Sequence, residues 1–237
     1  MSEANAAEAA GGAEATASVP LNQLAQFLQD GGPVLYVLLA VSILCLAVIL
    51  LKSLHFSMLR PGSTGFVAQT IALWREGETA GALASLEGKR SPVARVLKRA
   101  MESARDPAMS EDKVREEITR VAGIELDNLR SGLRLLSLIA TLSPLIGLLG
   151  TVLGMIAAFQ ALEASGSQVD PAILSGGIWV ALLTTAAGLI IAIPAAAAYQ
   201  WLDGIVYRSR RAMEDAATQV FTAAPGTRSG TVGQMAE

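Results

Sequence analysis

The stretch at residues 176–189, GGIWVALLTTAAGL, decides the fold class. It lies inside an uncharged run over residues 171–202, which exceeds the roughly 18 to 20 residues that cross a hydrocarbon core. Two further uncharged runs, over residues 31–51 and 135–162, meet the same length criterion. The sequence therefore predicts an all-α integral membrane protein with three transmembrane helices.

The composition agrees with a membrane protein. Of the 237 residues, 52% are hydrophobic and only 16% are charged, whereas an ordinary soluble domain has about 25% charged residues. The single cysteine, Cys45, lies in the first apolar run and can form no disulfide within the chain. Cys45 is therefore expected to be a packing or lipid-facing residue.

The positive charges predict the orientation of the chain in the membrane. Every Lys and Arg lies between Lys52 and Arg134 or after residue 202, whereas the first 51 residues contain no cation. The positive-inside rule then places the N-terminus outside, and the middle segment and the C-terminus inside. The N-terminal arm does not begin with the positive region of a cleaved signal peptide, so we expect a translocated, uncleaved tail.

These observations divide the chain into eight segments. We expect a disordered outer arm over 1–18, an amphipathic outer helix over 19–32, transmembrane helices over 33–56, 134–162 and 172–202, a cytoplasmic helical domain over 57–133, an outer loop over 163–171, and a cytoplasmic C-terminal helix and tail over 203–237. The apolar positions of the 19–32 segment recur at helical spacing, which favours a helix on the membrane surface. An early start of the first span remains the alternative.

The middle segment carries helix signals. Ser91 before Pro92 predicts a helix that begins at residue 92, and Ser110 before two acidic residues predicts another that begins at 111. No proline follows until Pro144, so one helix is expected to run from residue 111 into the second span. An apolar stripe marks the packed face of this helix: Val114, Ile118, Val121, Ile124, Leu129 and Leu133.

The spans contain small and hydroxyl residues at helical spacing. In LSPLIGLLGTVLGM, Gly150 and Gly154 form a small-xxx-small pair that permits close helix contact. Their role is either simple packing or the lining of a pore. The polar residues of the spans include Thr141, Ser143, Thr151, Thr184 and Thr185. Each hydroxyl could also simply bond a carbonyl of the preceding turn.

The motifs LSPLIGLLGTVLGM and GGIWVALLTTAAGLIIAIPAAAAYQ resemble the two core helices of the ExbB/TolQ proton-channel family, which is distantly related to MotA-type stators. The resemblance covers about residues 133–207. It implies a bacterial inner-membrane oligomer, typically a pentamer, with a periplasmic N-terminus. The central pore would enclose the helices of a single-span ExbD/TolR-like partner that carries a membrane Asp. Proton flow would energise a periplasm-spanning protein such as TonB or TolA.

The resemblance assigns roles to individual positions. The family's pore threonines fall on Thr151 and Thr185. Thr141, Gly147, Gly150, Gly154, Ala181, Thr184 and Gly188 are candidates for the pore or for helix packing. Val180 in GIWVAL replaces the glutamate of the family pattern GIxEAL, as in MotA-type members, so a close match to a TonB or Tol system is not implied.

Charge within the spans limits what this chain does alone. The three uncharged runs contain no Asp, Glu, Lys, Arg or His, whereas a proton path through a membrane needs a titratable group. A partner must therefore bring a carboxylate, which Thr151 and Thr185 would solvate. Along the third span the small residues Ala181, Thr185, Gly188 and Ala192 share one face, which we expect to let neighbouring copies approach.

Other function classes have little support in the sequence. The only histidine, His55, is expected at the level of the lipid headgroups beside Lys52, and not in an active site. We therefore expect that the chain is not an enzyme and that it holds no metal and no cofactor. We expect the chain to contact the lipid bilayer and not to bind nucleic acid. The alternatives left open are a stator of a gliding or flagellar-type motor and a non-conducting membrane scaffold.

The predicted orientation can be tested with topology reporters. A reporter inserted near Arg90 and one fused after Glu237 should both read as cytoplasmic, and a tag placed before Val19 should read as external. An external signal at Arg90 would overturn the orientation, because this position lies in the segment that carries most of the positive charge.

Overall fold

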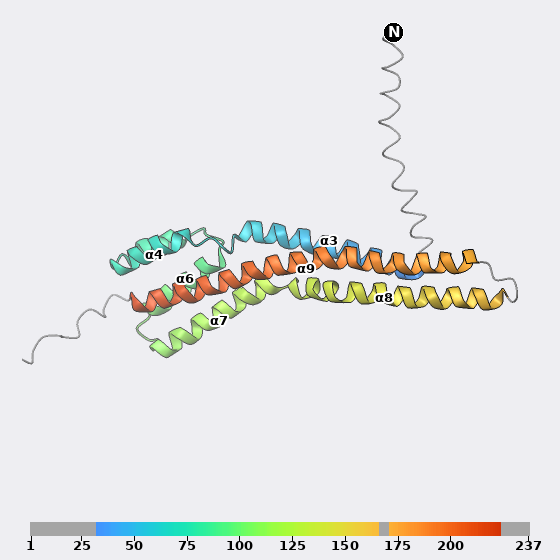
Figure 1. Ribbon diagram of the computed structural model, residues 1–237. Helices are drawn as coiled ribbons and strands as arrows, with labels where there is room; N and C mark the ends of the chain where they lie inside the picture. The colour runs from blue at the N-terminus through green and yellow to red at the C-terminus, as the bar shows by residue number, and fades with distance from the viewer. Residues whose placement is uncertain (1–31, 166–170, 224–237) are drawn as a thin grey trace, which may run out of the picture. The chain divides into compact units, whose positions relative to one another are not determined.

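The computed structural model describes residues 32–165 and 171–223, and these residues are all helical or in short connections (Figure 1). The helices are α3 (Gly32–Leu59), α4 (Gly65–Arg75), α5 (Thr79–Leu86), α6 (Pro92–Ala104), α7 (Glu111–Arg130), α8 (Leu133–Ala164) and α9 (Pro171–Thr222). The expected arm over 1–18 and nearly all of the expected surface helix over 19–32 lie outside the described residues. The all-α prediction is confirmed for the part of the chain that is described.

The chain forms two compact units. Among the described residues, the membrane unit comprises 32–47, 136–165 and 171–196, and the stem unit comprises 48–135 and 197–223. Helix α9 contributes to both, because it continues without interruption from Pro171 to Thr222.

Three helices are long and apolar enough to cross a membrane, as predicted. They are α3, α8 and α9, with mean hydropathies of 3.1, 2.0 and 2.1 in their most apolar stretches. Only 17% to 33% of those stretches is buried within the chain. Large apolar side chains such as Leu182 and Ile190 remain more than half exposed. Such surfaces require lipid or other transmembrane helices around them.

Two of the spans contain an internal proline. Pro144 lies inside α8 and Pro194 inside α9. Proline has no backbone N–H, so the carbonyls four residues earlier, at Ala140 and Ile190, lose their helical hydrogen-bond donors. Each helix therefore has one weakened turn.

The stem unit has an apolar core formed by amphipathic helices. Helix α6 buries Val93, Val96, Leu97, Ala100 and Met101 on one face, at the spacing of an amphipathic helix. Trp74 of α4 is 2% exposed, and its indole Nε1 donates a hydrogen bond to the carbonyl of Val220 at 3.3 Å. This bond ties the end of α9 to the middle segment of the chain.

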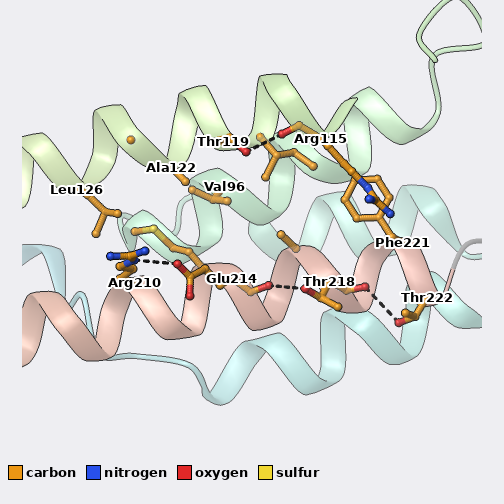
Figure 2. Close-up of a pocket in the computed structure, with 14 residues that line it drawn as sticks. Val96, Arg115, Thr119, Ala122, Leu126, Arg210, Glu214, Thr218, Phe221 and Thr222 are labelled. Atoms are coloured by element: carbon orange, nitrogen blue, oxygen red, sulfur yellow. Dashed lines mark hydrogen bonds and ion pairs between the residues drawn. The ribbon is translucent and has the colours of Figure 1, made fainter. Parts of the chain in front are cut away.

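The C-terminal part of α9 borders a groove with α6 and α7 (Figure 2). The groove has a volume of about 640 Å³, and its apolar walls include Val96, Ile118, Leu126 and Met213. Charges beside it pair with each other, since Arg210 Nε lies 2.8 Å from Glu214 Oε1.

The helix starts agree with the sequence signals, but one predicted helix is interrupted. Helix α6 begins at Pro92 after Ser91, and α7 begins at Glu111 after Ser110. The prediction of one helix from residue 111 into the second span is wrong, because α7 ends at Arg130 and α8 begins at Leu133. Gly132 between them has φ +77°, a left-handed conformation that glycine adopts readily and that ends a helix.

The predicted apolar stripe is buried in part. Val114, Ile118, Leu129 and Leu133 are at most 6% exposed, whereas Ile124 is 48% exposed. The stripe of α7 therefore contacts the core at its two ends more than in its middle.

Two charge clusters join α6 to α7. Glu125 is 9% exposed, and both of its oxygens accept hydrogen bonds from Arg95, whose Nε lies 2.6 Å from Oε1. The hydrogen bond that Arg95 donates to Glu125 raises the pKa of Arg95. Glu117 accepts hydrogen bonds from Arg120 at 2.7 Å and from Arg99 at 3.0 Å, and these bonds lower its pKa from 4.5 to about 2.

The Glu117 cluster predicts a pH dependence of stability. Because the pKa of Glu117 is lower in the folded state, its ionised form stabilises the fold above about pH 4.5, and this contribution is lost as the pH falls toward about 2. Glu117→Gln should therefore lower the Tm at pH 7 and flatten the decline of Tm in acid, measured by circular dichroism in detergent.

Glu116→Gln is the matched control, because Glu116 is exposed and forms no ion pair among the described residues. Parallel pH profiles for the Glu117→Gln and Glu116→Gln proteins would contradict the assignment.

Candidate ion-pathway site

The contact between α8 and α9 in the membrane unit brings most of the candidate residues together. Gly147 faces Thr184, Thr185 and Gly188, whereas Gly150 faces Thr184, and Gly154 faces Ala181. The order is that of two antiparallel helices, since residue numbers rise along α8 as they fall along α9.

The backbones approach so closely that only glycine fits at the centre of this contact. A Cβ atom on Gly188 would lie 2.6 Å from the carbonyl oxygen of Ser143, and one on Gly147 would lie 2.9 Å from the carbonyl oxygen of Thr184. Both neighbours are backbone atoms that cannot rotate away. The glycines are therefore packing residues within one chain, as in other membrane helix pairs with small residues.

The threonines differ in their surroundings. Thr184 is 1% exposed, and its Oγ1 donates to the carbonyl of Ala181 at 2.8 Å. Thr185 is half-buried, and its Oγ1 donates across the helix contact to the carbonyl of Gly147 at 3.3 Å. Thr151 is half-buried one turn after Gly147, with its Oγ1 bonded to the carbonyl of Leu148 at 2.7 Å. Thr185 and Thr151 thus present hydroxyls at the edge of the contact, and Thr184 does not.

Two hydroxyl residues lie before this cluster on α8. Thr141 is exposed and donates to the carbonyl of Ser137 at 3.0 Å. Ser143 is fully buried, and its Oγ donates to the carbonyl of Ile139 at 2.7 Å. The sequence indicated Ser143 only as one of the polar residues of the spans. In the structure, the carbonyl oxygen of Ser143 is the atom nearest to a Cβ built on Gly188.

Sequence reasoning also missed one further contact, between the end of α8 and the start of α9. Gly177 of α9 lies against Ala158 of α8, which is 4% exposed. The signal was present in the sequence, because Gly154 and Ala158 form a second small-xxx-small pair.

The small-residue face of α9 has a different partner from the one expected. Ala181 and Gly188 lie against Gly154 and Gly147 of α8 in the same chain. Their prediction as the surface where neighbouring copies approach is therefore corrected. The periodicity of the sequence identified this face of α9 correctly. The face contacts α8, the preceding span of the same chain, rather than a neighbouring copy.

Position Val180 adds no charge to the site. It is half-buried, directly before Ala181 in the helix contact. The apolar stretches 33–51, 135–162 and 172–202 contain no ionisable Asp, Glu, Lys, Arg or His. Among the described residues no group of His, Cys, Asp and Glu side chains is arranged to hold a metal. The site can accept and donate hydrogen bonds but cannot itself release a proton.

Comparison with known proteins gives the family. A profile of the MotA/TolQ/ExbB proton channel family matches residues 88–215, more than half of the chain. The chain belongs to this family. The match includes all of α6, α7 and α8 and most of α9. The resemblance seen in the two core motifs is thereby confirmed.

Individual members of the family show the same relationship. The chain is 52% identical over 86 residues to "Biopolymer transport protein exbB1" of Vibrio cholerae, covering 35% of this chain and 38% of that protein. It is 32% identical over 183 residues to "Putative biopolymer transport protein ExbB homolog" of Methanothermobacter thermautotrophicus, covering 76% of this chain and 62% of that one. A third relative, "Tol-Pal system protein TolQ" of Haemophilus influenzae, is 42% identical over 79 residues, 33% of this chain and 34% of its own. The chain thus spans less than two thirds of each of these relatives.

The glycine contact predicts a difference between two glycines of the same helix. Gly188→Ala should destabilise this family member by about 1 to 3 kcal/mol, because the added methyl forces α8 and α9 apart. Gly176→Ala is the control, since a Cβ there meets nothing within 4 Å. Thermal stability in detergent, followed by fluorescence-detected size exclusion, measures both. Equal melting temperatures for the two variants would contradict the close contact.

Proposed function

We propose that this chain is the ring-forming subunit of an ion-driven motor complex of the ExbB–ExbD or TolQ–TolR type. It resides in the bacterial inner membrane with its N-terminus in the periplasm and its C-terminus in the cytoplasm. The complex converts proton motive force into mechanical work on a periplasmic or outer-membrane partner, such as a TonB- or TolA-like protein. Family membership supports the channel class.

The observation that carries the proposal is the position of two hydroxyls in spans without charge. Thr151 and Thr185 are half-buried at the edge of the α8–α9 contact, and no ionisable Asp, Glu, Lys, Arg or His lies in the apolar stretches around them. A hydroxyl can hydrogen-bond both the protonated and the ionised form of a carboxylic acid. It therefore suits a surface past which a titrating group moves.

The titrating group must come from a partner. A single-span ExbD/TolR-like subunit with an Asp in its helix would supply it, because a buried carboxylate is costly unless polar groups surround it. The membrane potential supplies about 2.3 kcal/mol per proton per 100 mV, which is enough to bias protonation from one side.

The ring needs contacts between copies of the chain, with five copies as the expected number. The glycine faces of α8 and α9 are already used within each chain. Copies would therefore meet through the exposed apolar faces of the spans, which include Leu182 and Ile190. A closed ring of such contacts encloses a pore wide enough for partner helices rather than bulk water.

Two alternatives share this architecture. A stator of a gliding or flagellar-type motor fits the absence of a glutamate at Val180. A non-conducting scaffold would use the same helices and glycines without ion flow. Enzymatic activity is not part of the proposal, because a transport role requires neither a nucleophile nor a general base.

The experiment uses the complex co-purified with its single-span subunit. Thr151→Ala and Thr185→Ala should each lower proton uptake into proteoliposomes about tenfold, the effect of one lost hydrogen bond to a charged group. Thr151→Ser and Thr185→Ser keep the hydroxyl and should stay near the wild-type rate. Native mass spectrometry should find several copies of the chain, five being expected, in every variant.

Thr141→Ala is the matched control, because Thr141 is a threonine of α8 that is exposed, whereas Thr151 and Thr185 are half-buried. Wild-type uptake in both alanine variants at positions 151 and 185 would leave these threonines with a packing role only. A monomer in mild detergent, with or without the partner, would remove the pore itself.

A further inference from the structure

The cytoplasmic end of the first span borders a cavity that the proposed ion pathway does not use. It lies in the stem unit, has a volume of about 630 Å³, and is lined by residues that include Val48, Leu51, Lys52, His55, Asn128 and Ser131. The first four come from α3, and the last two come from the end of α7 and the connection to α8.

Lys52 brings a positive charge into this cavity without a counter-ion. It is half-buried, its Nζ lies 3.4 Å from the carbonyl oxygen of Leu129, and no carboxylate lies within 4.0 Å of it among the described residues. The same Nζ lies 5.9 Å from the centre of the Phe56 ring. Burial of an ammonium group with only a long hydrogen bond and an aromatic ring is unfavourable unless an anion joins it.

The other cation of the cavity is already paired. Arg95 lines the wall, but its guanidinium bonds both oxygens of Glu125 and donates from Nη1 to the carbonyl of Arg90 at 2.9 Å. The net attraction for an anion therefore centres on Lys52, with the exposed His55 one turn further along α3.

Neutral hydrogen-bond donors stand opposite Lys52. In the part of the chain that is described, the side chains of Asn128 and Ser131 make no hydrogen bond to protein. An amide N–H₂ and a hydroxyl can both donate to phosphate oxygens. Together with Lys52, they offer donors from two elements to one anion.

The remaining wall is apolar and continues the membrane surface of α3. Val48 and Leu51 belong to the final turns of the uncharged run over residues 31–51, and Leu51 is 67% exposed. A free phosphate ion would leave this apolar wall in contact with water. A phospholipid places its phosphate beside Lys52 and its acyl chains along Val48 and Leu51, which matches both halves of the cavity.

We propose that this cavity binds the phosphate group of an anionic phospholipid, such as phosphatidylglycerol, in the inner leaflet. The proposal rests on the orientation given under the proposed function, which places Lys52 at the cytoplasmic membrane surface. It adds a lipid site that is separate from the threonines of the pore.

The test compares lipid retention in nanodiscs of phosphatidylglycerol with nanodiscs of phosphatidylcholine, using the complete chain. Native mass spectrometry after release should find phosphatidylglycerol bound to the wild-type protein with an affinity about five times that of Lys52→Gln, the effect of one cation at an anionic surface. Lys52→Arg should retain the lipid as the wild type does. Phosphatidylcholine should be retained equally by all variants.

Arg208→Gln is the charge-matched control, because Arg208 lies on α9 just past the third apolar run but does not line the cavity. Equal retention by the wild type and Lys52→Gln, or equal loss in Lys52→Gln and Arg208→Gln, would overturn the site. Displacement of the lipid by millimolar inorganic phosphate would show a free-anion site and overturn the lipid assignment.

The same spectra report the number of copies of the chain. If several copies of the chain are found but lipid retention is the same with and without Lys52, the lipid site is refuted and the ring is not. If only a monomer is found and Lys52→Gln still loses phosphatidylglycerol, the ring is refuted and the lipid site is supported.

Discussion

The membrane unit depends on the backbone contact between α8 and α9. Within lipid the hydrophobic effect does not draw helices together, so close packing and hydrogen bonds must hold them. Here that packing occurs where Gly188 meets the Ser143 carbonyl and Gly147 meets Thr184. The register of this contact buries Thr184 and leaves Thr185 and Thr151 at its edge. The chemistry available to a partner therefore follows from which side chains the glycines leave uncovered.

The stem unit is stabilised by different forces, because it combines an apolar core with charged side chains on its surface. Apolar side chains such as Trp74, Leu97 and Met101 are buried, and paired charges join α6 to α7. In the pair of Arg95 with Glu125 only the carboxylate is buried, so desolvation of Glu125 offsets part of the attraction and the pair contributes to a defined geometry as well as to stability. Lys52 is the contrasting case, since its partner is a carbonyl rather than a carboxylate. Within the described part of this unit, the charge of Arg95 is balanced by Glu125, whereas the charge of Lys52 has no carboxylate beside it. Arg95 therefore has a structural role, and Lys52 remains available to an anion.

The sequence predicted what depends on local pattern and failed where tertiary contacts decide. Span number follows from run length, and the starts of α6 and α7 follow from Ser91 and Ser110. The break at Gly132 was missed because the absence of proline does not ensure a continuous helix. Periodicity likewise showed which face of α9 is small but not what covers it. The Lys52 cavity could not be predicted, since Lys52 and Leu129 lie 77 residues apart.

The positions of Pro194 and Gly132 have a mechanical consequence. Chain crossings between the two units lie at residues 47–48, 135–136 and 196–197. Pro194 removes a helical hydrogen bond just before the last crossing, and the α7–α8 break at Gly132 lies just before the second. The backbone therefore lacks a helical hydrogen bond beside each of these two crossings, whereas α3 continues as a regular helix through the first. Local weak points of the backbone thus fall beside two of the three places where the chain passes from one unit to the other, and α3 keeps its hydrogen-bonded turns at the remaining one.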